Sequence, residues 1–194
     1  TLFRSFSPDG KLLAAVGSTA DSNHVLKIWS TQAWQAGPIA VKKLFNTRPH
    51  HNRLVHKIVF SPDSRYLLSN EFSGTINIWN MQDIFTGPTE LKEPDGAPAF
   101  DMWTEGMAFS PDGKYMITQG FVLNQGKYLR DPNEDDNFRY PVIKVWQPGN
   151  LQAGSLEPVE GNWSQDVQFS PDGKYVLTVA PDAVGVWQVF DSAS

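Results

Sequence analysis

Several residue types and patterns are missing from this sequence, and each absence excludes a class of protein. The 194 residues include no cysteine, which excludes disulfide bonds, thiolate catalysis and cysteine-based zinc sites. No apolar run approaches the ~20 residues that a membrane-spanning helix requires, so membrane insertion is not expected. The net charge of −5 argues against nucleic acid as a partner, because phosphate binding requires a basic face.

Catalytic motifs are missing as well. All four histidines lie between His24 and His56, and there is no Gly-x-Ser-x-Gly elbow, His-Glu-x-x-His motif or phosphate-binding glycine loop. An active site assembled from scattered acids and arginines would leave no such motif, but nothing in the sequence supports one. We therefore expect no enzymatic activity, no cofactor and no metal ion.

One short phrase occurs four times along the chain. It reads FSPDG from Phe6, Phe109 and Phe169, and FSPDS from Phe60. Proline, aspartate and glycine in this order are typical of a turn, and each copy lies between two runs of apolar residues. The phrase therefore predicts a hairpin turn between two β-strands, with an architectural and not a catalytic role.

The repeat continues beyond the turn. Each copy is followed by a β-branched run that ends in a tryptophan: Trp29, Trp79, Trp146 and Trp187. After the first three tryptophans an apolar residue and then a glycine follow at constant spacing, and a further short strand is predicted near 39–45, 89–93 and 155–160. Four antiparallel strands per unit are typical of a propeller blade.

These repeats resemble the WD-repeat β-propeller family over essentially the whole chain. The resemblance implies an all-β propeller of four-stranded antiparallel blades, with four repeats present and a last blade that lacks its outer strand. The expected blades span about 1–46, 54–93, 104–160 and 163–190. It also implies a scaffold for protein–protein interaction.

The family pattern includes a buried polar network that the resemblance transfers to His51, Ser69 and Trp79. The repeats are degenerate, because Ser73 stands at the expected aspartate and no repeat tryptophan is followed by aspartate. Phe100 and Glu160 stand at the histidine position of later units. Hydroxyl side chains recur at Thr118 and Thr178, whereas Ala15 breaks the pattern, so the network is expected to be incomplete.

The ends of the sequence predict a piece of a larger propeller. The chain starts at Thr1, inside a predicted strand, and ends seven residues after Trp187, before the glycine that the other units place there. Neither end supplies the extra strand that would close the ring. Further blades of a longer chain, or self-association, would then complete it.

An insertion interrupts the third repeat at 122–141, in a predicted hairpin loop. Long loops without structure of their own are often functional, and insertions in repeat proteins collect on the binding face. The insertion carries acids, arginines and aromatics: Asp131, Glu134, Asp135, Asp136, Arg130, Arg139, Tyr128, Phe138 and Tyr140. Arginine and aromatic side chains favour protein recognition, but a solvated decoration would explain the same loop.

The same insertion alternates oxygen-bearing side chains at Asp131, Asn133, Asp135 and Asn137, in the manner of a calcium loop. The glycine and the final glutamate of such a loop are replaced by Asp136 and Val142. A solvated acidic segment explains these residues better than a calcium site.

The segment 41–57 is basic, with five lysines or arginines, three histidines and no acid. An outer strand followed by a solvated loop explains this charge, although an anion or partner site containing Arg48 and Arg53 would also fit. In a blade of four antiparallel strands, this connection and the insertion emerge at the same edge. The two segments would then form a charge-divided rim suited to selecting a partner.

Trp103 and Trp163 lie at the start of the first strands of their units, where the resemblance places residues near the mouth of the central channel. Ordinary packing at the end of a blade would also explain both rings. The main hypothesis is a non-catalytic scaffold that binds protein through the loop face. The alternative is a small-ligand binder or an enzyme with its site at the channel mouth.

Overall fold

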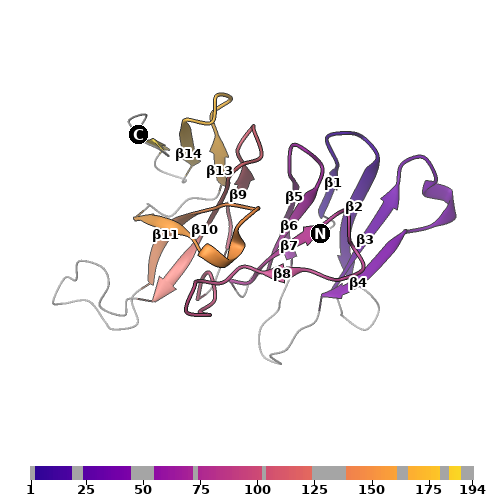
Figure 1. Ribbon diagram of the computed structural model, residues 1–194, viewed down its shortest axis with the longest axis horizontal. Coiled ribbons are helices and arrows are strands. Elements are labelled where there is room, and N and C mark those ends of the chain that lie inside the picture. Colours follow the sequence, from indigo (N-terminus) through magenta and orange to yellow (C-terminus); the bar gives the residue numbers. More distant parts are fainter. Residues whose placement is uncertain are drawn as a thin grey trace.

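In the computed structural model the chain forms four antiparallel β-sheets that stand side by side in a row (Figure 1). The structure describes residues 3–18, 24–44, 55–71, 74–101, 104–123, 139–160, 166–179 and 184–188. Each sheet consists of strands that are consecutive in the chain, and we call the sheets blades 1 to 4. Within these residues no sheet combines strands from both ends of the chain, so strand exchange does not close a ring.

The strands follow the order expected from the repeats. Blade 1 contains β1 (Phe3–Phe6), β2 (Leu12–Ser18), β3 (His24–Ser30) and β4 (Ala40–Leu44). Blade 2 contains β5 (Val55–Phe60), β6 (Tyr66–Glu71), β7 (Ile76–Asn80) and β8 (Thr89–Glu90). Blade 3 contains β9 (Met107–Phe109), β10 (Met116–Leu123), β11 (Arg139–Trp146) and β12 (Leu156–Glu160). Blade 4 contains β13 (Asp166–Phe169), β14 (Tyr175–Val179) and β15 (Val184–Gln188).

Among the described residues, the predicted all-β propeller architecture is confirmed, with three four-stranded blades and a three-stranded fourth. Short 3₁₀ turns, η1 (Trp34–Ala36) and η2 (Leu151–Ala153), lie in the connections to the fourth strands of blades 1 and 3. No helix among the described residues is long and apolar enough to span a membrane.

The four FSPD phrases form the turns between the first two strands of each blade, along the upper edge in Figure 1. In blade 1 the backbone N–H groups of Lys11 and Leu12 donate hydrogen bonds to Asp9 Oδ1 (3.1 Å) and Ser7 Oγ (2.9 Å). The Ser7 hydroxyl in turn donates to Asp9 Oδ1 at 2.6 Å. The serine therefore closes the turn together with the aspartate, a role that the Pro-Asp-Gly pattern alone did not predict.

The turn aspartates are stabilised as carboxylates. Hydrogen bonds from the motif serine, then from the backbone N–H two residues on, lower the pKa of Asp9, Asp112 and Asp172. Partial burial would raise the pKa of Asp63, but hydrogen bonds from Ser61 and Arg65 outweigh it and lower that pKa too. The turns are therefore built for the ionised aspartate.

Glycine closes three of the turns in a left-handed backbone conformation, with φ of 70° at Gly113. Replacing Gly113 with alanine is expected to lower the free energy of unfolding by about 1–2 kcal/mol, because a Cβ is disfavoured at this φ even without a clash. Gly149→Ala is the matched control, since Gly149 is not among the positive-φ glycines and a Cβ there meets nothing within 4 Å. Chemical denaturation would measure both variants, and equal stabilities would contradict the prediction.

Neighbouring blades pack through two unlike faces. We call the face that points toward the next blade in the sequence the forward face, and the opposite one the rear face. Between blades 1 and 2, the forward face contributes Ala14, Val16, Leu26 and Ile28, and the rear face contributes Ile58, Phe60, Leu67 and Trp79. Equivalent buried clusters join blade 2 to blade 3 and blade 3 to blade 4. The core therefore lies between the blades, in three successive layers.

Candidate functional site

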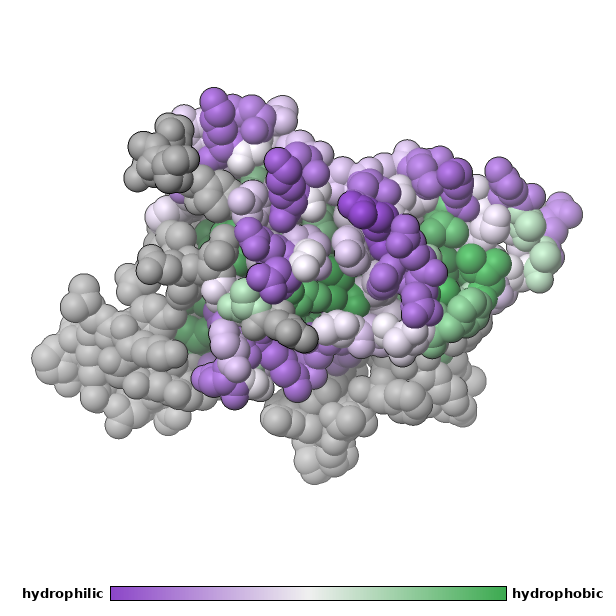
Figure 2. Space-filling model, viewed as in Figure 1, coloured by the Kyte–Doolittle hydropathy of each residue, from purple (hydrophilic) through white to green (hydrophobic). Residues whose placement is uncertain are grey.

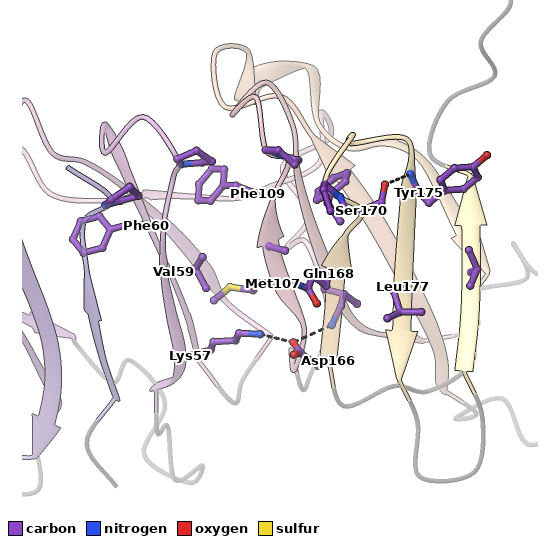
Figure 3. A pocket seen from close by; sticks show the side chains of 18 residues that line it. Lys57, Val59, Phe60, Met107, Phe109, Asp166, Gln168, Ser170, Tyr175 and Leu177 are labelled. Atoms are coloured by element: carbon purple, nitrogen blue, oxygen red, sulfur yellow. Dashed lines mark hydrogen bonds and ion pairs between the residues drawn. The ribbon is translucent and has the colours of Figure 1, made fainter. Parts of the chain in front are cut away.

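A groove of about 1050 Å³ runs along the inner strands β5, β9 and β13, and we call it the inner groove (Figure 3). The prolines of the four FSPD turns line it, together with the three repeat phenylalanines of blades 2 to 4: Pro8, Pro62, Pro111, Pro171, Phe60, Phe109 and Phe169. Val59, Met107 and Leu177 add further apolar surface. The groove therefore offers mainly apolar contacts.

One ion pair crosses the inner groove at the end opposite the turns (Figure 3). Lys57 Nζ on β5 lies 2.5 Å from Asp166 Oδ1 on β13, so the pair joins blade 2 to blade 4. Gly106 occupies the equivalent position in blade 3, where a Cβ would lie 2.8 Å from Val167 Cγ2. The backbone N–H of Val167 also donates to Asp166 Oδ1 at 3.0 Å.

This charge pattern limits the chemistry of the inner groove. Asp166 is the only carboxylate among the lining residues that the structure describes, and it is paired with Lys57. General acid–base catalysis by paired carboxylates requires a second acid, which these lining residues do not supply. Across the described part of the chain, no group of three or more His, Asp or Glu residues is arranged to hold a metal ion.

Most of the predicted partner-binding residues lie outside the described residues. These are Arg48, Arg53, Trp103, Tyr128, Arg130, Asp131, Glu134, Asp135, Asp136, Phe138 and Trp163, and the calcium reading of the insertion falls there too. His51 and Ser73 also lie outside them. The structure does describe the strand ends on either side of 45–54 and 124–138.

The insertion is narrower than the sequence predicted, and the expected limits of 122–141 are wrong. β10 continues to Leu123, β11 begins at Arg139, and these two residues pair directly. Arg139 and Tyr140 therefore belong to a strand and not to the loop. The reason is that Val122 and Leu123 find partners across the ladder, which a loop assignment based on repeat length does not reveal.

Strand pairing shows which segments leave from the same edge. Leu44, at the end of β4, pairs with His24, the first residue of β3. Likewise, Leu123 at the end of β10 pairs with Arg139, the first residue of β11. The connections 45–54 and 124–138 therefore both leave from the edge opposite the FSPD turns, and we call this edge the loop face.

Three of the four repeat tryptophans bond to a hydroxyl across their blade. Trp79 Nε1 donates to Ser69 Oγ at 2.9 Å, and both side chains are buried. Trp146 bonds in the same way to Thr118 at 2.8 Å, and Trp187 to Thr178 at 3.1 Å. In blade 1, Ala15 stands at the hydroxyl position and offers no acceptor to Trp29.

Sequence reasoning missed a polar cluster between blades 2 and 3. Lys144 on β11 is almost fully buried, and its Nζ donates to Glu93 Oε1 and to the backbone oxygen of Ala99, each at 2.6 Å. The ammonium lies 5.1 Å from the centre of the Phe100 ring. Ser155 donates from its backbone N–H and its hydroxyl to Glu93. The sequence shows a lysine inside a β-branched run, which indicates an unusual residue in a buried strand. This pattern does not predict that Glu93 and Ala99 are its partners.

Comparisons with known proteins agree with this architecture. The family described as "WD domain, G-beta repeat" matches residues 42–80. Histone transcription regulator slm9 of Schizosaccharomyces pombe is 23% identical over 72% of this chain, and Protein hir-1 of Neurospora crassa is 23% identical over 91%. Transcriptional corepressor LEUNIG_HOMOLOG of Arabidopsis thaliana is 25% identical over 95%.

The similarity covers only part of each of these proteins. The chain spans 18%, 16% and 24% of the three relatives, respectively. A chain from "Crystal Structure of Mitotic Checkpoint Complex" shares the fold with a TM-score of 0.61 and 20% identity, over 97% of this chain and 49% of that chain. The repeated strand order and these similarities show the fold of a WD-repeat β-propeller, with the family's repeat itself matched at residues 42–80.

Proposed function

We propose that the chain is a non-catalytic scaffold that binds a protein partner through the loop face. The observation that carries this proposal is the construction of the β10–β11 hairpin. Both strands are eight residues long and pair in register from Met116↔Trp146 to Leu123↔Arg139. The insertion 124–138 therefore starts from a paired base, and its arginine and aromatic residues are of the types that dominate protein interfaces.

The names of the relatives support a role in assemblies. A transcriptional corepressor and a histone transcription regulator are among the proteins similar to this chain. The structural neighbour belongs to a multiprotein complex by its title. A propeller that presents loops from several blades suits such a role.

Charge on the loop face would provide partner selection. Because β4 ends and β11 begins at the same edge, the proposal assigns Arg48 and Arg53 to the rim that also carries the acids of 131–136. Trp103, Trp163 and Tyr128 would add apolar contacts within the same interface. Basic and acidic segments side by side select a partner of complementary potential and accelerate its association.

The inner groove favours this function over the alternative of a small-ligand binder or enzyme. Its charged lining, within the residues described, consists of Lys57 and Asp166, which neutralise each other. Specific small-molecule sites usually combine an apolar wall with several converging polar groups. Among the lining residues described, Gln168, Ser170 and Tyr175 are the uncharged polar side chains, and all three lie on blade 4.

Replacing 124–138 with Asn-Gly tests the proposal. Leu123 and Arg139 pair directly, so a two-residue turn can close the hairpin, and the free energy of unfolding should change by less than about 1 kcal/mol. Partner capture from a lysate of the source organism should be lost. The matched control is Lys114→Ala with Lys174→Ala, which alters exposed charges at the opposite edge and should leave capture intact. Recovery of the same proteins by the shortened chain would show that the loop face is the wrong surface.

A further inference from the structure

The FSPD turn of blade 2 differs from the other three at its last residue. Ser64 stands where the other turns have glycine, at Gly10, Gly113 and Gly173. Its backbone has a φ of 62°, in the same left-handed region as those glycines, and of the described residues other than glycine it alone has a positive φ. A Cβ is disfavoured in this conformation, so serine costs stability that glycine would not. The strained backbone points to a contact that compensates for this cost.

The compensating contact reaches the turn of the neighbouring blade. The backbone N–H of Asp9, in the FSPD turn of blade 1, donates to Ser64 Oγ at 3.1 Å. Within the part of the chain that the structure describes, this is the one hydrogen bond that joins blade 1 to blade 2. The core between these two blades consists of apolar side chains. The Ser64 hydroxyl therefore adds a directional contact to an interface formed by apolar packing.

The other two junctions between FSPD turns lack this hydroxyl. At Gly113, beside the turn of blade 2, a Cβ would lie 3.9 Å from Pro62 Cδ. At Gly173, beside the turn of blade 3, a Cβ would lie 3.7 Å from Pro111 Cδ. Both are ordinary van der Waals distances, so a side chain would fit at either position. Glycine has no side-chain oxygen, however, and cannot accept a hydrogen bond from the aspartate N–H of the preceding turn.

We propose that Ser64 is a latch between blades 1 and 2, whose hydroxyl accepts from Asp9 and fixes the turn of blade 1 against the turn of blade 2. The left-handed serine is tolerated because of this bond. Both turns lie on the upper edge of the molecule, where Figure 2 shows mainly hydrophilic residues and water competes for the same groups. The latch therefore acts mainly on local opening of the blade 1 turn. It lies at the edge opposite the loop face and does not depend on the proposed function.

Two substitutions at Ser64 separate the bond from the strain. Ser64→Ala removes the acceptor and keeps the Cβ, whereas Ser64→Gly removes both. Hydrogen exchange followed by NMR should show the Asp9 amide exchanging about fivefold to tenfold faster in both variants. The Asp112 amide, in the turn of blade 3, is the internal control and should not change. The midpoint of chemical denaturation should fall for Ser64→Ala and stay close to that of the unmodified chain for Ser64→Gly, because glycine relieves the strain. An Asp9 amide that exchanges at the unmodified rate in both variants would overturn the proposal.

The latch should also be transferable to the next junction. Gly113→Ser places a hydroxyl beside the turn of blade 2, where it should accept from the backbone N–H of Asp63 and slow the exchange of that amide by about fivefold. Gly113→Ala is the matched control, because it adds the same Cβ and the same strain without an acceptor. Its Asp63 amide should exchange as in the unmodified chain, and its denaturation midpoint should lie below that of Gly113→Ser. Equal midpoints and equal Asp63 exchange in the two variants would also overturn the proposal, since the hydroxyl would then provide no contact between turns.

Discussion

Replacing Trp146 with alanine is expected to lower the free energy of unfolding by about 3–5 kcal/mol. The indole is fully buried between blades 2 and 3, and its Nε1 donates to Thr118 Oγ1 at 2.8 Å. The substitution would leave a cavity in the cluster that joins these blades and would remove the donor to a buried hydroxyl. Chemical denaturation followed by tryptophan fluorescence and circular dichroism would measure the loss.

Two further variants separate packing from hydrogen bonding. Trp146→Phe keeps most of the apolar contact but removes the N–H donor, so it should cost about 1–3 kcal/mol, less than alanine. Trp187→Ala should cost less than Trp146→Ala, because Trp187 is only partly buried in the last blade. Equal losses at Trp146 and Trp187 would contradict the view that burial between two blades determines the contribution of each repeat tryptophan.

Lys144→Met is expected to lower the free energy of unfolding by about 2–3 kcal/mol. It would remove the cation beside the partly buried Glu93 and the donor to the backbone oxygen of Ala99. The double variant Lys144→Met with Glu93→Gln removes the uncompensated charge and should recover part of the loss. A single variant as stable as the unmodified chain would show that the pair is energetically neutral.

The cost of Lys144→Met should also depend on pH. Burial would raise the pKa of Glu93, but hydrogen bonds from Lys144 and Ser155 outweigh it and hold the pKa below its ordinary value of 4.5. A carboxyl with a lowered pKa in the folded state stabilises the fold above the pKa of the unfolded chain, and this contribution is lost as the pH falls through the folded pKa. The difference between Lys144→Met and the unmodified chain should therefore narrow below about pH 4. Denaturation at pH 7 and at acidic pH would detect the change.

Local repeats predicted the fold because each hairpin is stabilised by residues that are close in the chain. Hydrogen bonds among Ser7, Asp9 and Leu12 close the first turn, and the same contacts recur in the other three FSPD turns. The tryptophan–hydroxyl pairs also lie within one β-hairpin, because Trp79 pairs with Leu67, two residues before Ser69. The partner-binding site was predicted from the insertion, from Arg48 and Arg53 of the basic connection, and from Trp103 and Trp163, and it stays a prediction.

The sequence by itself therefore determined the strand order, the turns and the number of blades, because these depend on local hydrogen bonds and on the alternation of apolar residues. Only the tertiary structure decided what lies between blades. Lys57, Gly106 and Asp166 each lie three residues before the repeat phenylalanine of their blade. Lys57 and Asp166 pair because the packing of blades 2, 3 and 4 brings these equivalent positions together. Lys144 contacts Glu93 and Phe100, which lie in the connection between β8 of blade 2 and β9 of blade 3. Side chains at equivalent repeat positions differ in burial, as Phe60 is buried and Phe6 is exposed. The difference arises because burial depends on whether a neighbouring blade covers the side chain, and the repeat itself is the same.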